Sequence, residues 1–315
     1  MGDADAARIA GRFAGEVAIN TKTGSGAADI GKSSGLGILA GRDMGMPASF
    51  DPGIYNEPFV TLCDEAPDRS VFPSGSFRVE WGPIFHRGRL DGTARILCIG
   101  QDPAQEEAVV RRILVGMAGH RVQGFLAKLG IDRSHVMVNA FLYSAYNQTS
   151  AKKYVNDPAI AGYRNRWLAA LTASASLEAV VAFGSLADTA WQEFAKSSDA
   201  AAAIPYQHVP HPTSPESGGA APEGIKKATA AMLRKWNTAL EALRQAVQHP
   251  DAVRPFVPYG VEFQPSELAE IPAFDMPAGT PPWMRGTEGW AARTGTTAAE
   301  KRRTITVQVP AGVIP

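Results

Sequence analysis

Four short apolar segments, separated by stretches with helical periodicity, limit what this chain can fold into more than any other feature of its sequence. Each segment is rich in β-branched residues, which favour strands. The four segments are Ala94–Ile99, His135–Phe141, Ala179–Phe183 and Ile204–Val209. Strands that alternate with helices are typical of a parallel sheet with helices on both faces. The pattern therefore predicts an α/β fold of three layers, α/β/α, with a short, mainly parallel four-stranded central sheet.

The expected helices lie between these strands or after the last of them. The first spans about Ala118 to Leu129, and the second spans about Pro158 to Ala175, with a proline in its first turn. A third begins after Gly184 and Ser185. The last, from Pro222 to Ala246, carries a continuous apolar stripe that is expected to pack against the sheet.

Changes in composition along the 315 residues divide the chain into three parts. Residues 1–50, rich in Gly, Ala and Ser, are expected to form a flexible or extended arm, with a short helix at Asp5–Phe13 and a strand at Glu16–Asn20 as candidate elements. Residues 51–249 hold the strands and helices of the predicted domain. From residue 250 to 315 prolines recur every few residues, which favours an extended strap or tail over a second folded unit.

Charge and cysteine content exclude several classes of protein. The 31 Lys and Arg residues balance the 31 Asp and Glu residues, so a polyanion would have to bind at a local basic patch. The sequence has two cysteines, Cys63 and Cys98, which excludes a disulfide framework and a four-cysteine zinc or iron–sulfur site. The N-terminus lacks a secretory signal and no apolar run is long enough to span a bilayer, so we expect a cytoplasmic monomer without membrane association.

The segment from Gly26 to Ser33, GAADIGKS, satisfies the written pattern of a phosphate-binding loop and follows a candidate strand. Such a loop needs a helix immediately after it, but residues 34–37, SGLG, are poor helix formers. We interpret the segment as part of the N-terminal arm. A nucleotide hydrolase built on this loop is a distant alternative, and it would be stabilised by ATP.

Polar residues follow three of the predicted strands. Gln101 and Asp102 come after the first strand, Asn139 lies at the end of the second, and His211 follows the fourth. Because the carboxyl ends of parallel strands lie at one edge of a sheet, these side chains are expected to converge on one cleft. A carboxylate, a carboxamide and an imidazole in one cleft indicate an active site.

The motifs around these residues resemble those of a known family. Gly100-Gln101-Asp102-Pro103, together with His211-Pro212-Thr213-Ser214-Pro215, resembles the uracil-DNA glycosylase superfamily. Its first motif reads Gly-Gln-Asp-Pro-Tyr in the best-known branch, and its second reads His-Pro-Ser-Pro. The segment from Arg112 to Gly119 is similar to one in the iron–sulfur branches, but with two cysteines the chain resembles a branch without an iron–sulfur cluster. The resemblance covers about residues 77 to 245.

The resemblance implies a monofunctional DNA glycosylase that flips uracil out of DNA and hydrolyses its N-glycosidic bond, leaving an abasic site and free uracil. It implies no metal and no cofactor. Asp102 would orient a water and favour the positive charge that develops on the sugar. His211 would donate a hydrogen bond to a uracil carbonyl oxygen as negative charge grows there, together with backbone amides near Gln101. Asn139 would offer uracil a donor and an acceptor, a pairing that cytosine would not satisfy.

Three positions depart from the family pattern. Ala104 stands where the best-known branch has a tyrosine that blocks the thymine methyl, so a glycosylase of wider range for deaminated or mismatched bases is an alternative. Leu114 stands where a phenylalanine stacks on uracil, and leucine has no π-face. Phe141 and Tyr143 are the candidates for an aromatic surface in its place. The second motif also carries an extra residue, Thr213.

Contacts to DNA phosphates are expected from residues that flank the site. These are Lys152, Lys153, Ser214 and Arg112. The segment from Leu142 to Asp157 has no histidine, so we expect ordinary turnover and not the covalent trapping of DNA for which a related branch uses a histidine there. A DNA-binding protein that keeps the fold without turnover is a further alternative, but binding alone would not require Asp102, Asn139 and His211 together.

Overall fold

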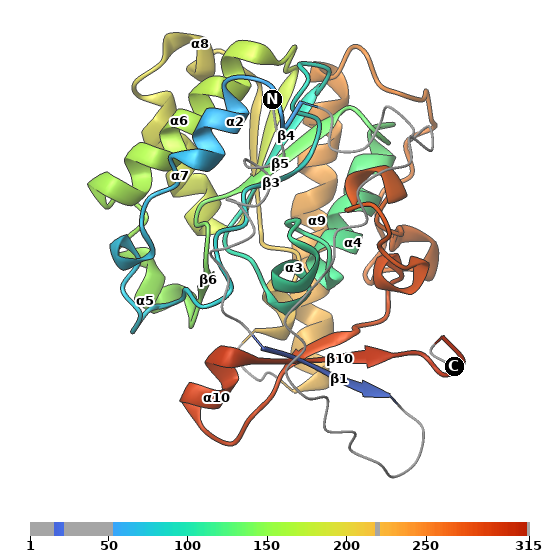
Figure 1. The fold of residues 1–315 in the computed structure, drawn as a ribbon. Helices are drawn as coiled ribbons and strands as arrows, with labels where there is room; N and C mark the ends of the chain where they lie inside the picture. Colours follow the sequence, from blue (N-terminus) through green and yellow to red (C-terminus); the bar gives the residue numbers. More distant parts are fainter. Residues whose placement is uncertain (1–15, 22–52, 218–220, 314–315) are drawn as a thin grey trace, which may run out of the picture.

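A five-stranded sheet forms the centre of the structure, a computed structural model that describes residues 16–21, 53–217 and 221–313. The strands follow the order β3-β5-β4-β7-β8 (Figure 1). They are β3 (His86–Gly88), β4 (Ile96–Gly100), β5 (His135–Asn139), β7 (Ala179–Phe183) and β8 (Tyr206–Val209). Strand β3 is antiparallel to its neighbour β5, and the other four strands run parallel. The α/β fold and the mainly parallel sheet predicted from the sequence are confirmed.

The prediction of four strands is wrong because it misses the edge strand β3. This strand has the three-residue sequence HRG and pairs with β5. It contains no aliphatic or β-branched residue, so it lacks the composition that indicates a strand. The four strands predicted over residues 94–99, 135–141, 179–183 and 204–209 are all present.

Helices cover both faces of the sheet, which confirms the three-layer arrangement. The longer helices are α4 (Met117–Lys128), α6 (Pro158–Ser174), α7 (Ser185–Ala195) and α9 (Pro222–Ala246). The shorter helices are α2 (Phe59–Asp64), α3 (Gln105–Val110), α5 (Gln148–Lys152), α8 (Asp199–Ala202) and α10 (Ala298–Arg303). Cys98 of β4 shares a core with Phe125 of α4 and Trp236 of α9. The next residue, Ile99, belongs to a second core with Trp167 of α6, because successive side chains of a strand point to opposite faces.

The C-terminal segment, residues 250–313, is largely extended and packs on the face covered by α4 and α9. Ile271 and Met276 belong to the same core as Phe125. Three short 3₁₀ turns interrupt the segment: η3 (Pro265–Glu267), η4 (Ala273–Asp275) and η5 (Pro282–Arg285). The segment therefore completes one side of the core instead of forming a core of its own.

The two ends of the chain form a second, small sheet, here called the terminal sheet. It consists of β1 (Glu16–Thr21), β9 (Ala291–Arg293) and β10 (Thr304–Val309). Strand β10 lies between the other two, parallel to β1 and antiparallel to β9. The strand predicted at Glu16–Asn20 is thus present. Figure 1 shows the terminal sheet beneath α3, and α3 contacts β9 directly. Another small sheet pairs β2 (Phe77–Arg78) with β6 (Ser144–Ala145).

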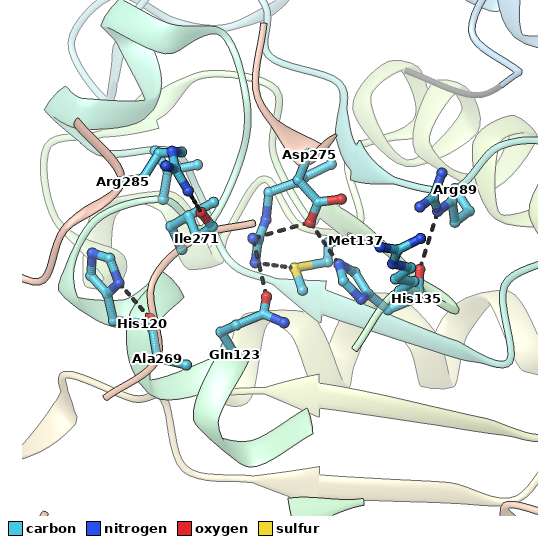
Figure 2. Close-up of polar contacts among 12 residues, drawn as sticks. Arg89, His120, Gln123, His135, Met137, Ala269, Ile271, Asp275 and Arg285 are labelled. Carbon is cyan, nitrogen blue, oxygen red and sulfur yellow. Dashed lines mark hydrogen bonds and ion pairs between the residues drawn. The ribbon is translucent and has the colours of Figure 1, made fainter. Parts of the chain in front are cut away.

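A buried ion network attaches the C-terminal segment to the central sheet (Figure 2). Oδ2 of Asp275 in η4 lies 3.3 Å from Nη1 of Arg87 in β3 and 2.8 Å from Nε2 of His135 in β5. Gln123 of α4 accepts a further hydrogen bond from Arg87. Burial alone would raise the pKa of Asp275, but His135 and Arg87 outweigh that effect and hold the pKa below its ordinary value. The carboxylate of Asp275 is therefore ionised and compensates the buried charge of Arg87.

Two sequence expectations, the helix at Asp5–Phe13 and the loop pattern at Gly26–Ser33, lie outside the described residues. Among the residues described, no helix is long and apolar enough to cross a membrane.

Candidate active site at the carboxyl edge of the sheet

The segments that carry the predicted site residues leave the central sheet at the same edge. Strands β4, β5 and β8 run in the same direction and end at Gly100, Asn139 and Val209. Neighbouring strands are spaced by about 4.8 Å, and β7 lies between β4 and β8, so the ends of β4 and β8 are about 10 Å apart.

Asp102 lies just beyond β4 and is half-buried. Its Oδ2 accepts a hydrogen bond from the backbone N–H of Ala145 in β6, 2.9 Å away. Burial raises the pKa of Asp102 to about 6 and Glu107 adds to the effect, although the Ala145 hydrogen bond and the charge of Arg78 act against it. At pH 7 the carboxylate is mostly ionised but more basic than a surface aspartate.

Asn139 is the last residue of β5 and lies beside the end of β4. It pairs with Gly100 in the sheet, and a Cβ atom at position 100 would overlap Oδ1 of Asn139. The same Cβ position lies 3.6 Å from Cδ1 of Leu114, so the side chains of Asn139 and Leu114 both border the space over Gly100. Oδ1 of Asn139 is buried and has no hydrogen-bond partner among the described residues. A buried acceptor without a partner is costly, and a ligand that donates a hydrogen bond would remove that cost.

The ring of His211 is held in one tautomer by Thr213. Nδ1 of His211 lies 3.3 Å from the backbone N–H of Thr213 and 3.2 Å from its Oγ1. Because a backbone N–H can only donate, Nδ1 is the acceptor and the proton of the neutral ring is on Nε2. Burial, with a smaller effect of the nearby charge of Arg121, lowers the pKa of His211 to about 4. The imidazole is therefore neutral at pH 7 and offers an Nε2–H donor.

The loop that carries His211 is fixed by contacts from α4 and α9. Arg121 of α4 donates to the carbonyl oxygen of Pro212 and forms two hydrogen bonds with the carboxylate of Glu216, at 2.7 and 3.1 Å. Trp236 of α9 donates to the carbonyl oxygen of Pro210. The histidine is thereby positioned by two long helices, so its orientation does not depend on the loop alone.

The side chain of Gln101 reaches the start of α7. It is 1 % exposed, and its Oε1 accepts a hydrogen bond from the backbone N–H of Leu186 in the first turn of α7. A Cβ at Gly184 would overlap the carboxamide of Gln101, and Gly184 has a φ of +96°, so glycine is required there on both grounds. The contribution of Gln101 to a bound base is thus limited to its backbone and to the Nε2 atom.

Glu107 shapes the chain between Asp102 and Leu114. Its Oε2 accepts from the backbone N–H of Ala104, which caps α3, and its Oε1 accepts from the backbone N–H of Val115. One carboxylate therefore ties the first turn of α3 to the segment that presents Leu114. Leu114 itself has a φ of +53°, an unusual conformation for leucine that this tie helps to maintain.

The three candidate stacking residues lie in different surroundings. Leu114 is 6 % exposed and lies against Asn139. The ring of Phe141 packs against that of Phe77 and is 1 % exposed, and Tyr143 is also buried. Ala104, in contrast, is exposed at the start of α3. Position 104 therefore has room for a larger side chain, and Leu114 is the stacking candidate that directly adjoins Asn139.

The residues predicted to contact DNA phosphates divide into two groups. Lys152, Lys153 and Ser214 are exposed. Arg112 is only partly accessible, and burial lowers its pKa to about 10 while the charge of Asp275 acts against that shift. Arg112 thus lies within the electrostatic reach of the buried ion network, whereas the other three side chains face solvent.

Sequence reasoning missed the residues that hold the site in place. Ala145 binds Asp102 through its backbone, which no side-chain pattern can indicate. Glu107 binds the backbone N–H of the N-cap residue as in a capping box, but the N-cap is Ala104, so the sequence lacks the Ser or Thr that would indicate one. The insertion of Thr213 was visible, but its role as the donor to His211 requires the loop geometry.

A scan of the chain against protein-family models found no match, and a search of curated proteins found no significant match. The functional interpretation rests on the residues and their geometry.

Proposed function

We propose that this chain is a monofunctional uracil-DNA glycosylase. The observation that supports the proposal best is the pair of opposite protonation states at one edge of the sheet. Asp102 is an ionised carboxylate with a pKa raised by burial to about 6, and His211 is a neutral imidazole with a pKa lowered by burial to about 4. Cleavage of an N-glycosidic bond needs negative charge near the sugar and a neutral hydrogen-bond donor near the departing base.

In the proposed reaction a water adds to C1′ of the deoxyribose as the bond from C1′ to N1 of uracil breaks. Asp102 orients this water, stabilises the positive charge on the sugar, and accepts the proton that the water loses. His211 donates its Nε2–H to a uracil carbonyl oxygen, and so stabilises the negative charge of the departing base. The products are free uracil, after it takes up a proton, and an abasic site in the DNA.

Recognition of uracil is assigned to Asn139. Its buried Oδ1 has no partner within the described part of the chain, and the ring N–H of uracil would supply one. The amide nitrogen would donate to the adjacent uracil carbonyl. Cytosine presents a ring nitrogen without a proton and an amino group at these two positions, so it would leave the buried carboxamide unpaired.

A second candidate function is a glycosylase of wider range. The observation that favours it is the small, exposed side chain of Ala104, which leaves room at the position where a tyrosine would exclude the thymine methyl. Replacement of Ala104 by tyrosine would suppress release of thymine or bulkier bases in this case. Release that persisted in that variant would show that the methyl group is excluded or admitted elsewhere.

The proposed enzyme acts on DNA as a cytoplasmic monomer, without a cofactor. The experiment that tests it measures base release from matched oligonucleotides that carry a single uracil, thymine or hypoxanthine, with a chelator present and without nucleoside triphosphates. Release from the uracil strand alone supports the main proposal, and release from several bases supports the wider range. Binding without release from any strand would contradict both, and would favour a non-catalytic DNA-binding protein.

A further inference from the structure

A cluster of arginines from three separate segments surrounds Tyr146, next to the proposed active site. The guanidinium carbon of Arg78 in β2 lies 4.3 Å from the centre of the Tyr146 ring, and that of Arg302 in α10 lies 5.6 Å from it. Arg293 in β9 is close enough that its charge acts on Arg78 and Tyr146. Two of the three arginines therefore come from the C-terminal segment.

Arg293 has an unusual environment for a cation. Its Nη1 is buried and has no hydrogen-bond partner in the part of the chain that the structure describes. Burial, together with repulsion from Arg78, lowers the pKa of Arg293 to about 10, so the guanidinium is still charged at neutral pH. A charged donor with an open hydrogen bond and a cationic neighbour is suited to bind an anion.

Three carboxyl groups, those of Asp102, Glu80 and Glu106, act electrostatically on these arginines. Glu80 pairs with Arg302 at 3.0 Å. Glu106 lies close to Arg293, but burial and the neighbouring Glu107 raise its pKa to about 7, so about half of it is protonated at neutral pH. Arg78 donates to the carbonyl oxygen of Ala145 and to Oγ of Ser144, which are neutral acceptors. Arg302 is therefore ion-paired, whereas among the described residues neither Arg78 nor Arg293 forms an ion pair with a carboxylate.

The cluster adjoins Asp102. The charges of Arg78 and Arg293 both act to lower the pKa of Asp102. Arg78 binds the carbonyl of Ala145, the same residue whose N–H holds Asp102. An anionic group of a substrate whose sugar is positioned at Asp102 would thus meet this cluster.

We propose that Arg78, Arg293 and Arg302 bind a phosphodiester group of the DNA strand beside the flipped nucleotide. Guanidinium groups match phosphate oxygens with paired hydrogen bonds, and a phosphate would supply the missing partner of Arg293. The identity of the ligand as DNA rests on the proposed function. The terminal sheet and α10 are then part of the DNA-binding surface, because they supply Arg293 and Arg302.

The test measures the dissociation constant of a fluorescent oligonucleotide without uracil as a function of salt concentration. Arg293→Gln is expected to weaken binding about threefold to tenfold near 0.1 M salt, and to reduce the slope of log K against log salt by about one. Arg293→Lys is expected to recover most of the slope, since it keeps the charge. Lys196→Gln is the matched control, because Lys196 is exposed at the far end of α7, which begins at the carboxyl edge.

An unchanged salt slope in Arg293→Gln would overturn the inference. Arg302→Gln provides a second variant should the first fail to fold, and a thermal unfolding scan establishes that each variant is folded. Tight binding of deoxyuridine monophosphate with none of the oligonucleotide would also overturn it, since the anion would then belong to a free nucleotide.

The test of the phosphate site can be distinguished from the test of the glycosylase proposal. If the wild type binds DNA but releases no base, and Arg293→Gln still reduces the slope, the phosphate site stands and the glycosylase proposal fails. If the wild type releases uracil and Arg293→Gln changes neither the slope nor KM, the glycosylase proposal stands and the phosphate site fails.

Discussion

Oδ2 of Asp102 lies 2.9 Å from the backbone N–H of Ala145, so the segment after β5 fixes the carboxylate that follows β4. The second oxygen of the carboxylate is not used in this bond and is available to a water. The position of the Asp102 carboxylate therefore depends on the segments after both β4 and β5. Substitutions in either segment are expected to affect the same chemical step.

Replacement of Asp102 by asparagine is expected to lower kcat for uracil release by about 10² to 10⁴, the usual contribution of a positioned base. The affinity for uracil-containing DNA should stay within about threefold, since asparagine keeps the size and shape of the aspartate side chain. Single-turnover kinetics and anisotropy titrations measure the two quantities. Equal losses in both would mean that Asp102 has a structural role.

The pH dependence of turnover is expected to follow Asp102 alone between pH 5 and 8. Its pKa is raised by burial to about 6, so kcat should rise about tenfold per pH unit below pH 6 and level off above it. His211, with a pKa lowered to about 4, is neutral across this range, so its titration does not change kcat between pH 5 and 8. A second inflection near pH 6.5 would show that His211 titrates in the working range.

Replacement of Asp102 by asparagine is also expected to make the protein more stable at pH 7 to 8. The pKa of Asp102 is about 6 in the folded protein and 3.8 in the unfolded chain, so protonation of Asp102 stabilises the folded state. This stabilisation is lost as the pH rises through about 6. Asp102→Asn removes the buried charge, so the free energy of unfolding should increase by about 1–2 kcal/mol at neutral pH, a value reduced for the partial exposure of the carboxylate. Urea titrations at pH 4 and pH 7.5 check this, and the difference from the wild type should disappear at pH 4.

Gly100→Ala is expected to displace the carboxamide of Asn139, because the added Cβ overlaps Oδ1. Overpacking of this kind costs about 1–3 kcal/mol of stability, and uracil release should fall with it. Gly75→Ala is the matched control, since a Cβ at that position meets no atom within 4 Å. The ratio of kcat/KM for uracil over cytosine is the decisive measurement, and a ratio equal to that of the wild type would refute the role of Asn139 in base recognition.

Thr213→Val removes the hydroxyl that lies 3.2 Å from Nδ1 of His211 and leaves the backbone N–H in place. We expect kcat to fall about tenfold, equivalent to one hydrogen bond, with little change in DNA affinity. Thr238→Val on the exposed side of α9 is the control. A loss of affinity without a loss of kcat would assign Thr213 to binding and not to the orientation of His211.

Asp275→Asn leaves the buried charge of Arg87 without its counter-ion and is expected to destabilise the fold by about 3–5 kcal/mol. Glu193→Gln breaks an ion pair with Lys196 at the surface and should change stability by less than about 1 kcal/mol. Chemical denaturation of both variants measures the difference. Similar small effects in the two would mean that the ion network around Asp275 contributes little.

The layers of the fold could be predicted from the sequence because local patterns encode them. The apolar run at Ala179–Phe183 coincides with β7, and the segment with an apolar stripe at Pro222–Ala246 coincides with α9. Strand β3 could not be predicted, since Arg87 is buried in it by an ion pair with a residue far along the chain. The terminal sheet is non-local in one of its two pairings, because β10 pairs with the nearby β9 and also with β1 at the other end of the chain.

The candidate site, like the fold, could be predicted where local sequence patterns determine it and not where tertiary contacts do. Asp102, Asn139 and His211 were predictable because strand ends in a parallel sheet share an edge. The positions of Gln101 and Arg112 were not, since each side chain makes a contact that only the three-dimensional structure shows. Gln101 binds the start of α7, and Arg112 donates to the carbonyl oxygen of Arg111. The sequence pattern thus predicts which residues lie at the shared edge of the sheet. Tertiary packing determines which of their side chains are oriented towards a substrate.

The ion network around Asp275 also bears on how the chain folds during its synthesis. Arg87 and His135 leave the ribosome long before residue 275, so the first two hundred residues cannot bury β3 without exposing an uncompensated positive charge to the interior. The central sheet is then expected to stay loose at the β3 edge until the C-terminal segment emerges. A nascent chain is therefore expected to complete this edge of its core only after residue 275 has emerged.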